Sequence, residues 1–134
     1  MDTTRRVNWQ PIGALPLIAQ MIADGVGNAS EHWATIQQAR PGSLDDATVS
    51  RIERVFGEGA AFVDIYHEQL CRWQRESLTQ AQAAEVAELL VQVAKLRSLT
   101  TSILQHAAVL GTQTIESIMD DATLGMAALL RGRL

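Results

Sequence analysis

The chain has 134 residues, of which 47% are hydrophobic and 19% charged, and its formal net charge is −4. This composition is typical of one globular domain and excludes a chain that is disordered throughout. The weakly acidic charge disfavours a surface that binds nucleic acid, because phosphates are repelled by acidic side chains. We therefore expect a single domain, residues 1–134, that binds no nucleic acid.

The single cysteine, Cys71, excludes a disulfide within the chain and is typical of a reducing compartment. Arg5-Arg6 precedes an apolar run at 12–23. Twin-arginine export signals also have paired arginines before an apolar segment. Pro16 and Gln20 interrupt that run, so we expect no export signal. No stretch reaches the length of a transmembrane span. These observations predict a cytoplasmic protein that does not enter a membrane.

The first 14 residues predict an extended arm, in which Trp9 anchors the arm onto the body of the domain. Helix one is expected at 16–40, because a proline opens it and apolar residues then recur on one side. Gly25 and Gly27 weaken that pattern, since each glycine costs about 1 kcal/mol relative to alanine inside a helix. Helix one is therefore expected either to run through both glycines or to kink there.

Two long helices are predicted next, at 44–75 and 80–110. Apolar residues recur in both at alternating spacings of three and four, as in a coiled coil, so they form one seam along each helix. The seam positions are Val49, Ile52, Phe56, Gly59, Val63, Tyr66, Leu70 and Trp73 in the first helix, and Val86, Leu89, Val93, Leu96, Thr100, Ile103, Ala107 and Leu110 in the second. The link at 76–79 has only four residues. It is too short to join two long helices in any arrangement except an antiparallel hairpin.

The ends of these helices carry recognisable signals. Asp45 and Asp46 stand where the helix dipole favours negative charge, and Thr79 with Gln82 predicts a capping box. Gly111 is expected to end the second long helix by adopting the left-handed (αL) backbone conformation.

The positions that flank the two seams are apolar, whereas a two-stranded coiled coil has charges there. These positions are Val55, Ala60, Phe62, Leu90, Leu99 and Leu104. A third helix is therefore needed to cover the hairpin, and helix one is the candidate. We predict an all-α fold, a long antiparallel helical hairpin completed to a three- or four-helix bundle by the N-terminal helix and short C-terminal helices at 112–130.

Two segments depart from the regular pattern. Small residues at Gly57 to Ala61 indicate either a locally weak helix or, as we prefer, a notch that a tryptophan or another helix backbone approaches closely. Asp120-Asp121-Ala122-Thr123 repeats the chemistry of Asp45 to Thr48 and predicts a second helix start, after a short helix capped by Thr112 or Thr114. The residues from 124 to 130 are apolar nearly all round and require burial.

Residues that could carry chemistry are few. Asp64, His67 and Cys71 share one helix face and could hold a metal such as zinc, with His106 or His32 as a fourth ligand. A solvated polar strip explains the same spacing, and we expect no metal. The chain has no glycine-rich phosphate loop, dinucleotide fingerprint or nucleophile motif, so we expect no cofactor and no enzymatic activity.

Four segments stand out in the chain: Leu44 to Val49, Leu70 to Trp73, Leu78-Thr79 and Gly111 to Glu116. In these segments the chain resembles a group of small bacterial all-helical proteins of uncharacterised function, and the resemblance spans Asn8 to Leu130. These motifs are helix boundaries and core positions, and the group supplies no functional residue to carry over. The small residues at Gly57 to Ala61 depart from the bulkier, charged stretch of that group.

The function expected from these patterns is a non-enzymatic helical interaction module. More apolar positions are present than one chain can shield, so we expect a homo-oligomer, with a dimer favoured, or a protein partner. The expected interface residues are Phe62, Leu90, Leu99, Leu104, Leu124, Leu129 and Leu130. The alternative is a bundle that binds a small molecule or a metal, near Gly57 to Ala61 or at Asp64, His67 and Cys71.

Overall fold

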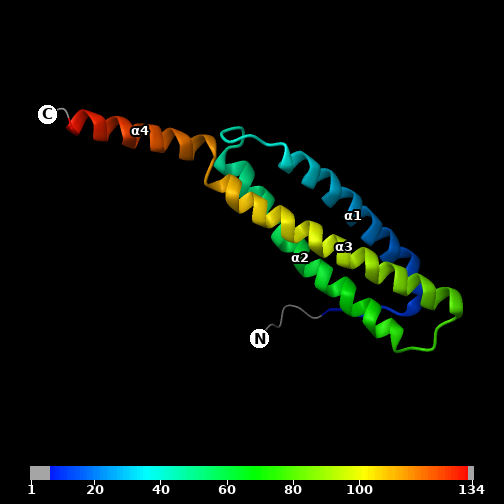
Figure 1. The fold of residues 1–134 in the computed structure, drawn as a ribbon. Coiled ribbons are helices and arrows are strands. Elements are labelled where there is room, and N and C mark those ends of the chain that lie inside the picture. The colour runs from blue at the N-terminus through cyan, green and yellow to red at the C-terminus, as the bar shows by residue number, and fades with distance from the viewer. Residues whose placement is uncertain (1–6, 133–134) are drawn as a thin grey trace.

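The computed structural model describes residues 7–132, and over that range it contains helices and loops but no strand (Figure 1). A 3-10 turn, η1 (Ile12–Ala14), leads into α1 (Leu15–Gln37), which is followed by α2 (Asp46–Gln74), α3 (Gln80–Gly111) and α4 (Ile115–Gly132). The expected all-α fold with a long helical hairpin is confirmed. Arg5-Arg6, weighed above as part of an export signal, lies outside the described residues.

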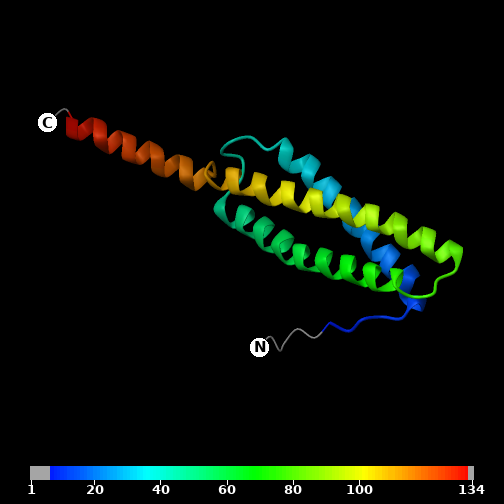
Figure 2. The same ribbon diagram turned by 60° about the horizontal axis from the view of Figure 1, so that its bottom comes forward.

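The bundle contains three helices, and α3 is the one that both others contact. α2 runs antiparallel to α3, while α1 packs along α3 on a different side (Figures 1 and 2). All eight seam positions predicted for α3 are buried, from Val86 to Leu110. Five of the eight in α2 are buried as well, namely Val49, Phe56, Val63, Leu70 and Trp73. The seams therefore form the core, as their spacing predicts.

The helix starts follow the predicted capping chemistry. The backbone N–H of Thr48 donates to Asp45 Oδ1 at 2.8 Å, and the hydrogen bond from Thr48 holds the pKa of Asp45 below its usual value. Thr79 and Gln82 form the predicted capping box, with hydrogen bonds of 2.9 and 3.1 Å. The predicted left-handed stop at Gly111 is wrong. Among the described residues only Gly42 has a positive φ, at 82°, and α3 instead ends where the Thr112 hydroxyl donates to Val109 O at 2.7 Å.

α1 is one continuous helix through both of its glycines, which settles the alternative left open by the sequence. A Cβ placed on Gly25 would lie 3.2 Å from Leu96 Cδ2, so this glycine lets the backbone of α1 approach α3. The close approach predicted at Gly57 to Ala61 is wrong. A Cβ on Gly57 or Gly59 would have no atom of another element within 4 Å. Gly57 and Gly59 of α2 therefore have no close neighbour, whereas Gly25 of α1 makes a close contact with α3.

Replacing Gly27 with alanine is expected to raise the free energy of unfolding by about 0.5–1 kcal/mol, because it restores helix propensity and a Cβ there meets nothing within 4 Å. Replacing Gly25 with alanine should stabilise less, since Leu96 must move to accept the added methyl group. Urea unfolding at equal protein concentration measures both. A Gly25 variant at least as stable as the Gly27 variant would contradict the close contact between α1 and α3.

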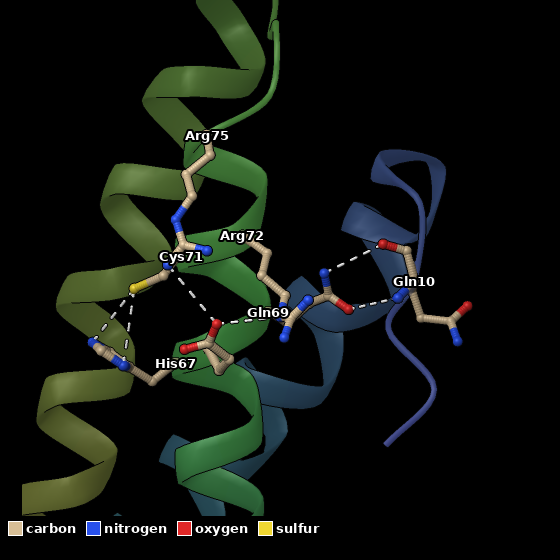
Figure 3. A network of polar contacts seen from close by, with 7 residues as sticks. Gln10, His67, Gln69, Cys71, Arg72 and Arg75 are labelled. Atoms are coloured by element: carbon tan, nitrogen blue, oxygen red, sulfur yellow. Dashed lines mark hydrogen bonds and ion pairs between the residues drawn. The ribbon is translucent and has the colours of Figure 1, made fainter. Parts of the chain in front are cut away.

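The N-terminal arm is held against the last turns of α2. The Arg72 guanidinium lies 4.2 Å from the centre of the Trp9 ring, which confirms Trp9 as an anchor. The backbone N–H of Gln10 donates to Gln69 Oε1 at 2.7 Å, and the indole N–H of Trp73 donates to Gln10 O at 2.9 Å. Figure 3 shows Gln69 on α2 facing Gln10 of the arm. The arm therefore covers one end of the space between α1 and α2.

The C-terminal segment differs from expectation. It is a single helix, α4, that extends past the end of the three-helix bundle (Figures 1 and 2). Asp120 and Asp121 lie inside α4, so the second helix start predicted there is wrong. The carboxylates follow five residues of unbroken helix, which the repeated sequence chemistry could not reveal. No helix among residues 7–132 is both long and apolar enough to cross a membrane.

Candidate functional site

The start of α4 is joined to the start of α2 by side-chain hydrogen bonds. The Thr114 hydroxyl donates to Asp46 Oδ1 at 2.6 Å and accepts from the backbone N–H of Ser117 at 3.2 Å. Glu116 Oε1 accepts from the backbone N–H of Asp46 at 2.9 Å. Thr114 is completely buried. Of the two threonines that could cap the C-terminal helix, Thr114 is therefore the one that does so.

Backbone contacts strengthen the same junction. The N–H of Gly42 donates to Gln113 O at 2.7 Å, and the N–H of Ile115 donates to Leu44 O at 2.9 Å. Gly42 has φ 82°, and a Cβ there would also lie 3.1 Å from Ile118 Cδ1. The junction therefore attaches α4 to the loop before α2 as well as to α3, and it sets the direction in which α4 leaves the bundle.

Along its whole length α4 exposes an apolar stripe, which we define as Ile115, Ile118, Met119, Ala122, Met126, Leu129 and Leu130. At 100° per residue these positions fall on one face of the helix. Between 42% and 65% of each large side chain in the stripe is exposed. Leu124 is 65% exposed but lies on the opposite face. A one-sided apolar helix without a neighbouring helix is typical of a surface that binds another protein.

A pocket of about 190 Å³ lies between α1 and α2, and α3 forms its floor. Leu96 and Thr100 of α3 lie at the bottom, and Gly25 and Gly59 leave room on the two sides. Tyr66 also lines the pocket, and burial raises the pKa of its hydroxyl. We call this space the α1–α2 groove. Its lining is mainly apolar, so it suits an apolar group and offers no obvious catalytic chemistry.

Two further apolar side chains stand at the edge of the α1–α2 groove on α2. Val55 is 47% exposed and Phe62 is 54% exposed. Phe62 was among the expected interface residues, and it is available to a partner. Leu90, Leu99 and Leu104 are half-buried and pack against the core of their own chain. Their exposed area is therefore smaller than that of Phe62 or of the α4 stripe.

The residues considered as metal ligands do not converge. Asp64 Oδ1 accepts a hydrogen bond from Arg97 at 3.0 Å, in an ion pair that is mostly exposed. His67 lies 3.8 Å from Cys71 Sγ on α2, and Figure 3 shows Arg72 and Arg75 in the same part of that helix. Within residues 7–132 no three histidine, cysteine or acidic side chains are placed to hold one ion.

The other two histidines each contact an aromatic ring on a neighbouring helix. His32 lies edge-on to Phe56, with ring centres 5.3 Å apart, and His106 lies edge-on to Trp33 at 5.7 Å. Both contacts join helices of the bundle. Neither histidine lies beside Asp64, His67 and Cys71 as a fourth ligand.

No protein-family model, curated protein or solved structure matches this chain. The resemblance to small bacterial helical proteins therefore stays a prediction, and the candidate site rests on the geometry of the chain itself.

The α4 stripe is the feature that sequence reasoning described least well. Its last residues, 124–130, are apolar nearly all round when they are taken by themselves. Counting from Ile115 at helical spacing places Leu129 and Leu130 on one face and Leu124 on the other. The one-sided spacing of apolar residues is therefore visible in the sequence. It is lost when the segment is divided at Asp120 by the predicted helix start.

Proposed function

We propose that this protein is a non-enzymatic, cytoplasmic interaction module that self-associates through its C-terminal helix. The observation that carries the proposal is the α4 stripe, an apolar face on a helix that extends beyond the bundle. Most of the stability of a protein helix comes from tertiary packing of its apolar face, which α4 lacks beyond its first turn within one chain. A second copy of the chain supplies that packing.

The size of the exposed surface supports a dimer. The six large side chains of the α4 stripe are each between 42% and 65% exposed, so together they present on the order of several hundred Å². A twofold dimer uses the stripe twice, and each stripe also covers apolar surface on the other copy. The total then reaches the range of about 1,200–2,000 Å² that stable interfaces bury.

Self-association should make thermal stability depend on protein concentration. Mass action favours the folded dimer as concentration rises, so a tenfold increase is expected to raise Tm by about 2–3 °C. Circular dichroism melts over a hundredfold concentration range measure this dependence. A Tm that stays constant over that range would count against self-association.

A second candidate function is the binding of a small apolar molecule in the α1–α2 groove. The pocket of about 190 Å³ beside Gly25 and Gly59 favours it, since an apolar cavity of about 150 Å³ can hold benzene. A fragment library screened by thermal shift tests this candidate, with a Gly59→Leu variant as the control in which the pocket is filled. Binding that the variant abolishes would support the second candidate, and an absence of hits would exclude it.

A further inference from the structure

We propose that α4 of one copy lies along the α1–α2 groove of a second copy, parallel to α2 of that copy, and that the second copy returns the same contact. This inference rests on the proposed self-association and names the surface that receives α4. Two features of the chain carry it: the direction of α4 and the match between apolar surfaces.

The direction of α4 sets the geometry. α4 leaves the bundle at the end where α3 stops and α2 begins, and it points away from the bundle (Figures 1 and 2). A twofold axis at that end places the second bundle alongside α4. The first turns of α4 then lie beside the start of the second α2, and both helices run in the same direction. At 1.5 Å per residue, the 18 residues of α4 span about 27 Å, which covers α2 from its start to about Val63.

The apolar surfaces match over this length. Val55 and Phe62 lie within the covered part of α2 and are 47% and 54% exposed. Between them Gly59 opens the pocket of about 190 Å³, because it has no side chain and no close neighbour. Met126 comes level with this part of α2 in the parallel arrangement. A methionine side chain is flexible enough to fill an irregular apolar pocket.

The acidic residues of α4 do not take part in this contact. Counted at 100° per residue, Asp120 and Asp121 lie about 140° and 120° from the centre of the α4 stripe, on the side of the helix that carries Leu124. They therefore stay in solvent when the stripe is covered.

Photo-crosslinking tests the location. Benzoylphenylalanine replaces Met126 in the full chain, and chains labelled with ¹⁴N and ¹⁵N are mixed so that mass spectrometry separates adducts between copies from adducts within one. The expected adducts join the two isotopic forms and map to α2 near Val55 to Phe62 or to α1 near Gly25. Adducts between two α4 helices, or only within one chain, would overturn the inference while leaving a measured dimer intact. A monomeric mass would instead refute the proposed self-association.

Discussion

Replacing Trp73 with alanine is expected to lower the free energy of unfolding by about 3–5 kcal/mol. The Trp73 side chain is completely buried and belongs to the core, and its indole N–H donates to Gln10 O at 2.9 Å. The substitution therefore opens a cavity and removes one of the bonds that hold the arm. A loss of this size is a large fraction of the 5–15 kcal/mol that a domain of ordinary stability has.

Urea unfolding followed by circular dichroism measures the change, with all variants at one protein concentration because the chain is expected to self-associate. Trp73→Phe is the control, since it keeps an aromatic ring in the core but removes the N–H donor. We expect it to cost about 1–2 kcal/mol, mainly from the lost hydrogen bond and the smaller ring. A loss below about 1 kcal/mol for the alanine variant would place Trp73 outside the core.

Replacing Leu129 with glutamate is expected to weaken self-association by about 100-fold or more. Leu129 lies in the α4 stripe and is 65% exposed, so the substitution leaves the folded monomer almost unchanged. In a dimer, the substitution removes a buried leucine from each copy and puts a carboxylate in an apolar contact. Each copy thereby loses about 1.5–3 kcal/mol, and every 1.4 kcal/mol is a factor of ten in the dissociation constant.

Leu124→Glu is the matched control, because Leu124 is also 65% exposed but lies on the opposite face of the same helix. It should leave the dissociation constant within about threefold of the native value. Sedimentation velocity over a concentration series measures all three proteins. Equal weakening by both substitutions would mean that the whole helix, rather than the α4 stripe, is responsible.

The bundle could be predicted from sequence because its determinants are local and periodic. Every seam position of α3 from Val86 to Leu110 is buried, and the caps at Asp45 and Thr79 act as expected. Each of these features depends on residues three or four positions apart, which a single helix brings together whatever surrounds it.

The features that could not be predicted depend on contacts between distant segments. Thr114 reaches Asp46 across 68 positions, and no spacing rule relates the two residues. The close contact between α1 and α3 falls at Gly25 rather than at Gly57 to Ala61, although both segments have small residues. Which residue packs against a glycine depends on the angle and position at which two helices cross. The periodicity of one helix does not specify that geometry.

The solution mass of the full chain at micromolar concentration tests the central claim most directly. Light scattering coupled to size exclusion should give about 29 kDa, twice the 14.6 kDa of one chain, because each α4 stripe is covered by a second copy. A mass of 14.6 kDa throughout the micromolar range would contradict the account. It would mean that the exposed face of α4 does not bind a second copy of this chain.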